Sequence, residues 1–237
     1  MLKGAKFMIK KKGKFYFKGT NNRGILLCHG LTGSPDEMKE LGRYLNKLGY
    51  TVSCPEYSGH GTNDYNFLDT NVEIWYKEIN IAFEELEKEV ESIYVIGLSM
   101  GGTFTVKLAQ EREISGLVTM NAPVIGLPLK EEFDYIKNTD YDQEKFQKLL
   151  SLYNKFTVEV GQTTNLEKVK APLLVIQGAK DKERYKISSS MLMKYTKSLY
   201  KSRLDFQESG HVIVIEEERY DLFDVIRDFL IEIEKMF

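Results

Sequence analysis

Residues 93–102 read IYVIGLSMGG, an apolar run that leads into a serine between two glycines and then into a helical pattern over residues 103–110. A buried strand, a sharp turn and a helix, in that order, are what a G-x-S-x-G nucleophile turn requires. Gly97 and Gly101 lie two residues before and two after Ser99, where such a turn leaves no room for a Cβ atom. Alternatively, Ser99 only caps a helix with a glycine-rich start, since short patterns recur by chance. The pattern predicts a strand, turn and helix that hold the Ser99 hydroxyl above a sheet.

Short β-rich runs alternate with longer helical patterns on both sides of this turn. Besides residues 93–98, the runs are residues 24–28, 51–54, 116–120, 172–178 and 203–207. Several are almost continuously apolar, which is typical of strands that helices cover on both faces. The alternation predicts an α/β fold with a mostly parallel, doubly wound sheet flanked by helices. We expect the 237 residues to form a single domain.

Three amphipathic helices are indicated by apolar residues at helical spacing. These stripes occupy residues 38–48, 72–90 and 220–233. The first stripe follows the sequence SPDE, residues 34–37, which is a capping box with a proline at the first helical position. We therefore expect this helix to begin at Pro35, with the Ser34 side chain as its cap.

Residues 123–168 interrupt the alternation, because they contain no clear strand. A structureless loop of this length is uncommon in a compact domain, so we expect two or three short helices there. An insertion at the carboxyl side of a parallel sheet lies where ligands bind, which makes these residues a candidate lid. Each of its aromatic and leucine side chains either lines an acyl pocket or packs the insertion onto the domain. They are Phe133, Tyr135, Tyr141, Phe146, Leu149, Leu150, Tyr153 and Phe156.

A serine nucleophile needs a base within hydrogen-bond reach, most often a histidine. The chain has three histidines, His29, His60 and His211. His211 follows the run at residues 203–207 and precedes the last helical pattern, which puts it on a loop at the carboxyl edge of the sheet. We predict that His211 is the base, because Ser99 lies at the same edge.

The imidazolium that forms during attack needs a carboxylate to hold its tautomer and offset its charge. Asp181 follows the run at residues 172–178 and precedes His211, which gives the chain order serine, aspartate, histidine. Glu183 and Asp205 are competitors, but Asp205 falls inside an expected strand and Glu183 lies farther along the loop. We predict Asp181 as the carboxylate.

The sequence CHGLTG, residues 28–33, directly follows the first expected core strand. Its glycines let the backbone turn sharply, so that the Leu31 N–H can point at a developing oxyanion. The Met100 N–H, at the helix start after Ser99, would be the second donor of this oxyanion hole.

Three residues are expected to fix the neighbouring loops: His29, Gly30 and His60. His29 would orient its loop by hydrogen bonding and would not be the base. His60 lies in the sequence SGHG, residues 58–61, where a simple surface-turn role is an equal alternative.

Charge and composition exclude several function classes. With 33 Lys plus Arg against 35 Asp plus Glu, the net charge of −2 gives no reason to expect nucleic acid as a partner. The two cysteines, Cys28 and Cys54, make no disulfide framework. No cluster has metal-ligand spacing and no glycine-rich phosphate loop occurs, so neither a metal nor a cofactor is implied. Without a secretory signal or a membrane-spanning run, we expect a cytoplasmic protein with no stable membrane insertion.

Five segments carry a family resemblance: LLCHGLTGSP (residues 26–35), SGHG (58–61), GLSMGG (97–102), PLLVIQGAKD (172–181) and ESGHVIVIEEER (208–219). Together they resemble the small bacterial carboxylesterases and monoacylglycerol lipases of the α/β-hydrolase superfamily. The resemblance runs from about Gly24 to the C-terminus. Two departures stand out, because Leu31 replaces an aromatic residue that is frequent in the family, and residues 182–185 replace a Val-Pro pair.

The resemblance implies an α/β-hydrolase fold with a small helical lid. It also implies a catalytic triad and an oxyanion hole at the residues chosen above: Ser99, Asp181, His211, Leu31 and Met100. We expect a serine hydrolase that cleaves short- to medium-chain acyl esters or monoacylglycerols through an acyl-enzyme on Ser99. A thioesterase with the same triad and a non-catalytic binding protein are the alternatives, and monomer and homodimer both stay open.

Overall fold

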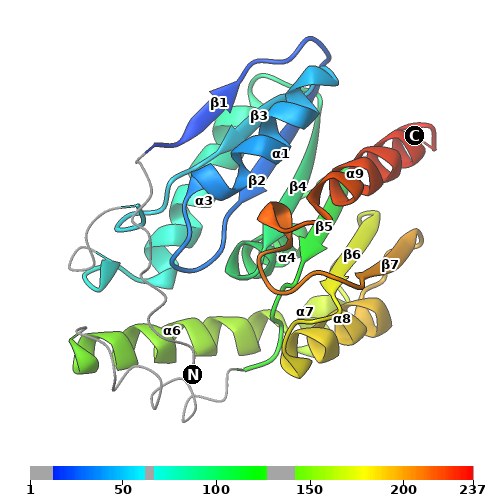
Figure 1. Ribbon diagram of the computed structural model, residues 1–237. Helices are drawn as coiled ribbons and strands as arrows, with labels where there is room; N and C mark the ends of the chain where they lie inside the picture. The colour runs from blue at the N-terminus through cyan, green and yellow to red at the C-terminus, as the bar shows by residue number, and fades with distance from the viewer. Residues whose placement is uncertain (1–12, 62–66, 127–141, 237) are drawn as a thin grey trace.

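The computed structural model describes residues 13–61, 67–126 and 142–236. Within these ranges, seven strands form one sheet in the order β1-β3-β2-β4-β5-β6-β7 (Figure 1). The strands from β2 to β7 are parallel, and β1 pairs antiparallel with β3. Their bounds are β1 Phe15–Phe17, β2 Arg23–Cys28, β3 Thr51–Cys54, β4 Ser92–Leu98, β5 Gly116–Met120, β6 Leu173–Gly178 and β7 Lys201–Phe206. The predicted α/β fold with a mostly parallel sheet is therefore confirmed.

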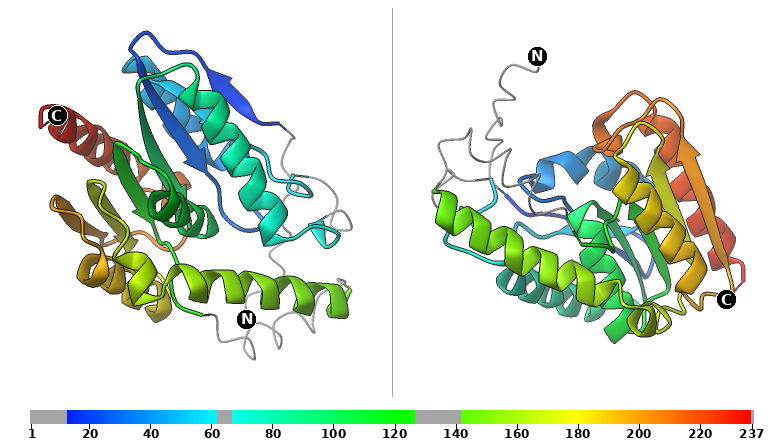
Figure 2. Two further views of the ribbon diagram at one scale, coloured as in Figure 1. Left: turned by 180° about the vertical axis from the view of Figure 1, so that it is seen from behind. Right: turned by 90° about the horizontal axis from the view of Figure 1, so that it is seen from below.

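Helices cover both faces of this sheet (Figures 1 and 2). One face packs against α1 (Pro35–Lys47) and α9 (Arg219–Glu234), and the other packs against α3 (Val72–Glu87), α4 (Met100–Glu111) and α8 (Glu183–Tyr195). Strand β2 shows how one sequence serves both cores, because successive side chains of a strand point to opposite faces. Ile25 and Leu27 belong to the core under α1 and α9, while Leu26 and Cys28 belong to the core under α3 and α4.

The described residues 142–166 of the insertion form two helices, of which one is long and not short as expected. Helix α6 (Gln143–Val160) has 18 residues and α7 (Thr163–Leu166) has four. A continuous buried stripe favours the single helix, and the Asp142 side chain caps it by accepting from the Lys145 N–H at 3.1 Å. Phe133, Tyr135 and Tyr141 lie outside the described residues.

Helix α6 extends across the end of the molecule to which the parallel strands point (Figures 1 and 2). The Lys107 ammonium on α4 pairs with Glu159 at 3.0 Å, and the Gln110 amide donates to the Val160 carbonyl at 2.9 Å. The Phe156 ring lies 5.5 Å from the Phe104 ring, centroid to centroid. For Phe156, packing onto the domain is therefore the interpretation that fits.

Helix α1 begins at Pro35 as expected, but its capping differs from the prediction. The Ser34 side chain makes no capping hydrogen bond, and its buried hydroxyl has no partner within the described ranges. Instead, the Ser34 carbonyl accepts from the Glu37 N–H at 3.1 Å. The proline, whose fixed φ suits the first helical position, and not the serine hydroxyl, marks this helix start.

Candidate active site

Ser99 occupies a strained turn between β4 and α4. Its φ of 52° and ψ of −121° are unusual for a residue with a side chain, and its N–H donates to the Met120 carbonyl at 2.8 Å. Glycines make the turn possible: a Cβ on Gly97 would lie 2.3 Å from the Gly101 carbonyl oxygen, and one on Gly101 would lie 2.1 Å from that of Cys28. The predicted strand, turn and helix are thus present, and the Ser99 hydroxyl stands at the carboxyl edge of the sheet.

His211 and Asp181 converge on Ser99 from two other loops at the same edge. The His211 Nε2 atom lies 2.8 Å from Ser99 Oγ, and its Nδ1 atom lies 2.8 Å from Asp181 Oδ2. Asp181 follows β6 and is almost fully buried, and its Oδ1 atom accepts from the Lys182 N–H at 2.7 Å. About a third of the His211 side chain is exposed, so a substrate can reach it. The three groups form one continuous hydrogen-bonded chain.

The two competing carboxylates lie elsewhere. Asp205 is on β7 and pairs with Arg203 at 2.8 Å, and Glu183 is exposed at the start of α8, within 3.9 Å of the Lys186 ammonium. Neither has a contact with His211 in the described part of the chain. Of the three carboxylates considered, Asp181 is therefore the one that the described structure places against His211.

The loop after β2 passes directly beside Ser99. A Cβ on Gly30 would lie 3.5 Å from the Ser99 Cβ, and the loop turns through a Gly33 N–H to Gly30 carbonyl bond of 3.2 Å. The N–H groups of Leu31 and Met100 donate to no acceptor in the described residues. Two free donors beside the serine, one of them at the start of α4, are what an oxyanion needs.

His29 lies under this loop and is fully buried. Its Nδ1 atom is 3.0 Å from the Gly30 carbonyl oxygen, and its ring stacks on Tyr57 with centroids 3.9 Å apart. Burial, with the neighbouring His60 adding to it, lowers the pKa of His29 well below 6.5. A neutral His29 is able to hold the loop through this hydrogen bond, and its loop-fixing role stays a prediction.

His60 is almost fully buried, and its ring packs against other aromatic rings. Neither ring nitrogen has a hydrogen-bond partner among the described residues, and the ring packs edge-on against Trp75 at 4.7 Å and Phe67 at 5.0 Å. Burial lowers the pKa of His60 to about 4. The loop itself is tied down by Glu78, whose carboxylate accepts from both the N–H and the hydroxyl of Ser58. No local sequence pattern pointed to Glu78.

Tyr185 is a second residue that the sequence analysis missed. Its ring packs on the His211 imidazole with centroids 4.3 Å apart, and the Arg184 guanidinium lies over the same ring at 4.8 Å. Tyr185 lies within the segment in which the chain departs from the Val-Pro pair. This departure places an aromatic ring against the candidate base.

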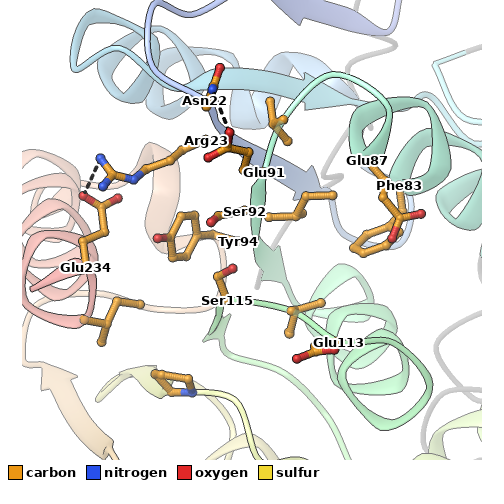
Figure 3. Close-up of a pocket in the computed structure, with 15 residues that line it drawn as sticks. Asn22, Arg23, Phe83, Glu87, Glu91, Ser92, Tyr94, Glu113, Ser115 and Glu234 are labelled. Atoms are coloured by element: carbon orange, nitrogen blue, oxygen red, sulfur yellow. Dashed lines mark hydrogen bonds and ion pairs between the residues drawn. The ribbon is translucent and has the colours of Figure 1, made fainter. Parts of the chain in front are cut away.

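A cleft of about 820 Å³ opens at the opposite edge of the sheet, at the amino ends of the strands (Figure 3). Its lining includes the carboxylates of Glu87, Glu91, Glu113 and Glu234. It contains none of the residues that converge on Ser99. Among the described residues, no group of three His, Cys, Asp or Glu side chains could hold a metal ion, and no helix is long and apolar enough to cross a membrane.

Comparisons with known proteins agree with this fold. A family model for the alpha/beta hydrolase fold matches residues 25–153, more than half of the chain. A carboxylesterase of Bacillus subtilis (strain 168) is 30% identical over 239 residues, which cover 91% of this chain and 95% of that protein. A thermostable monoacylglycerol lipase of Bacillus sp. (strain H-257) is 40% identical over 102 residues, 43% of this chain and 41% of that protein. The chain therefore belongs to the alpha/beta hydrolase fold family.

Solved structures show the same architecture. The monoacylglycerol lipase of Paleococcus ferrophilus is similar with a TM-score of 0.74 at 19% identity, covering 93% of this chain and 98% of that chain. A structure from the metagenome-derived lipolytic enzymes LipS and LipT is similar with a TM-score of 0.79 at 23% identity, covering 94% and 97%. At these identities the likeness concerns the fold.

Proposed function

We propose that this carboxylic ester hydrolase works through an acyl-enzyme on Ser99. The observation that carries the proposal is the unbroken chain from Ser99 Oγ through His211 to Asp181, with 2.8 Å at each link. A serine hydroxyl is a weak nucleophile alone, and a histidine that a carboxylate orients is the partner that activates it. The whole-length similarity to a curated carboxylesterase supports the same reaction.

In this mechanism the Ser99 Oγ attacks the acyl carbon while His211 Nε2 takes the hydroxyl proton. Asp181 holds the Nδ1–H of His211 and offsets the imidazolium charge. The tetrahedral oxyanion accepts hydrogen bonds from the N–H groups of Leu31 and Met100. His211 then gives its proton to the leaving alcohol, and a water that His211 activates hydrolyses the acyl-enzyme.

The substrates we propose are short- to medium-chain acyl esters or monoacylglycerols. The names of the relatives support this class, since one is a carboxylesterase and another a monoacylglycerol lipase.

The test is hydrolysis of p-nitrophenyl esters from acetyl to dodecanoyl by the wild type and by Ser99→Ala. If the triad acts as a unit, Ser99→Ala lowers kcat by about 10⁶-fold. A matched control is Ser115→Ala, because Ser115 lines the cleft at the opposite edge of the same sheet. Substantial turnover by a folded Ser99→Ala variant would overturn the proposal, and faster turnover of acyl thioesters than of the matched oxygen esters would favour the thioesterase alternative.

A further inference from the structure

Asn121 is a fully buried residue that directly follows β5, next to the three loops of the proposed triad. Its side-chain oxygen accepts from the Gly178 N–H at 2.7 Å, at the end of the strand that leads to Asp181. Its side-chain nitrogen donates to the carbonyls of Gly210 at 2.9 Å and His211 at 2.8 Å. One amide thus ties the Asp181 loop to the His211 loop.

This arrangement needs an amide and not merely a polar side chain. The Gly178 N–H requires an acceptor and the two carbonyls require donors, so the orientation of the Asn121 amide is fixed by its partners. The backbone of Asn121 is also special, because its φ of 49° lies in the left-handed region that asparagine tolerates better than most residues. The carbonyl of the preceding residue, Met120, accepts from the Ser99 N–H. The end of β5 therefore touches all three loops.

Glu216 binds the same histidine loop through N–H groups of the backbone. Its carboxylate accepts from the Gly210 N–H and, at 3.1 Å, from the Val212 N–H. These are the N–H groups directly before and directly after His211. The carbonyls of Gly210 and His211, on either side of the His211 Cα atom, thus bond to Asn121, and the N–H groups of the residues before and after His211 bond to Glu216.

We propose that Asn121 and Glu216 are positioning residues that together hold the His211 backbone, and that they set the distance from His211 to both Ser99 and Asp181. The inference rests on the proposed function, since it assigns these residues a role in that reaction. A misplacement of about 1 Å at a catalytic group can lower the rate by about 10²-fold, so backbone anchors of this kind affect kcat directly.

The test compares Asn121→Asp and Glu216→Gln with wild type. Asn121→Asp keeps the shape and the acceptor for Gly178, but it sets an oxygen against the two carbonyl oxygens. We expect its kcat to fall by about 10²-fold with KM little changed. Glu216→Gln keeps one acceptor oxygen, and we expect a smaller fall, of about tenfold.

The matched control is Asn46→Ala. The Asn46 side chain also donates to backbone carbonyls, those of Phe17, Lys18 and Tyr50, but it lies on α1 near the β1 edge of the sheet. Its loss lowers the melting temperature without moving the triad, so its kcat at a temperature well below melting stays at the wild-type value.

A second readout does not depend on turnover. The His211 Nδ1–H that Asp181 accepts gives a proton resonance far downfield in the wild type, and Asn121→Asp should weaken or shift it in a protein that is still folded. If Asn121→Asp does not fold, Asn121→Gly replaces it, because glycine tolerates the positive φ and removes only the amide.

The outcomes separate the two proposals. If the wild type shows the resonance but hydrolyses no ester, the proposed function is contradicted. The positioning role is then judged by whether the Asn121 variants weaken or shift the resonance. An active wild type whose Asn121 variants match Asn46→Ala in kcat and keep the resonance overturns the positioning role and leaves the esterase intact. A rise in KM with unchanged kcat also overturns it.

Discussion

The two ends of the central sheet are built differently. At the carboxyl end, the side chains of Ser99 and Asp181 are buried, and both bond to His211, which is 112 and 30 positions away in the sequence. At the amino end, Glu87, Glu91 and Glu113 are exposed around the cleft of Figure 3.

The backbone differs as well. The carboxyl end contains the strained turn at Ser99 and the left-handed Asn121, which persist only where the surroundings hold them. The cleft at the amino end is lined by ordinary strand starts and surface ion pairs, such as Arg23 with Glu234 at 3.2 Å. Under the proposed function, the chemistry lies at the end with the bonded polar groups and the strained backbone, and not at the end with the cleft of about 820 Å³.

After Ser99→Ala, the largest effect on this comparison is expected from Asp181→Asn. The variant removes the charge that orients His211, and loss of such a carboxylate lowers kcat by about 10⁴-fold. Asp205→Asn is the control, because Asp205 forms an exposed ion pair with Arg203 and should change kcat by less than about twofold. Ester turnover of both variants checks this, and a similar loss in the two would contradict the assignment of the carboxylate.

Gly101→Ala should disrupt the carboxyl end through packing. The new Cβ would meet the Cys28 carbonyl oxygen at 2.1 Å, so we expect the free energy of unfolding to fall by roughly 3 kcal/mol or more. In Gly30→Ala the nearest atom is 3.5 Å away, and the change should stay within about 1 kcal/mol. Urea denaturation measures both, and equal stabilities would show that the turn is looser than described.

The strands and the position of the candidate site could be predicted from the sequence alone. All six expected strands form with bounds within two residues, because apolar runs and glycine positions are local signals. The placement of Ser99, Asp181 and His211 at one edge was also predictable, since parallel strands bring their carboxyl ends together. Their catalytic roles stay predictions.

Other features of the structure could not be predicted from local sequence patterns. Asn121 and His211 are 90 positions apart, and Ser58 and Glu78 are 20 apart, so only the folded chain shows that they meet. The prediction that the Ser34 side chain caps α1 was wrong for a related reason. The motif does not show that the Ser34 hydroxyl is buried without a hydrogen-bond partner in the described residues. The length of α6 was missed because its charged residues hid one continuous buried stripe.

An acid-dependent loss of stability is expected from His60. The unfolded chain takes up a proton near pH 6.5, whereas burial lowers the pKa of His60 in the folded chain to about 4. As the pH falls from 6.5 to 4, the unfolded state therefore binds a proton that the folded state does not, and stability falls by about 2 to 3 kcal/mol. His60→Phe keeps a ring among Phe67 and Trp75 but cannot titrate.

Urea denaturation at pH 7 and pH 4.5 measures this loss. The wild type should lose more stability between the two pH values than His60→Phe does. Identical losses would mean that His60 takes up its proton normally in the folded protein.

The smallest effect is expected at the amino end. Glu113→Trp places a large ring in the cleft of Figure 3, at an exposed position. Since this cleft lies at the other edge of the sheet from Ser99, kcat/KM for p-nitrophenyl esters should stay at the wild-type value. A clear rise in KM would show that the cleft takes part in substrate binding and would remove the contrast between the two ends.

The central claim is that Ser99 is an activated nucleophile. The most direct measurement is labelling of the wild type and of Ser99→Ala with a fluorophosphonate, followed by intact-protein mass spectrometry. We predict one phosphonyl adduct per wild-type chain and none on Ser99→Ala, because only a serine hydroxyl activated by a base attacks the probe rapidly. A folded wild type that takes up no label, or a Ser99→Ala variant that is labelled equally, would contradict the account.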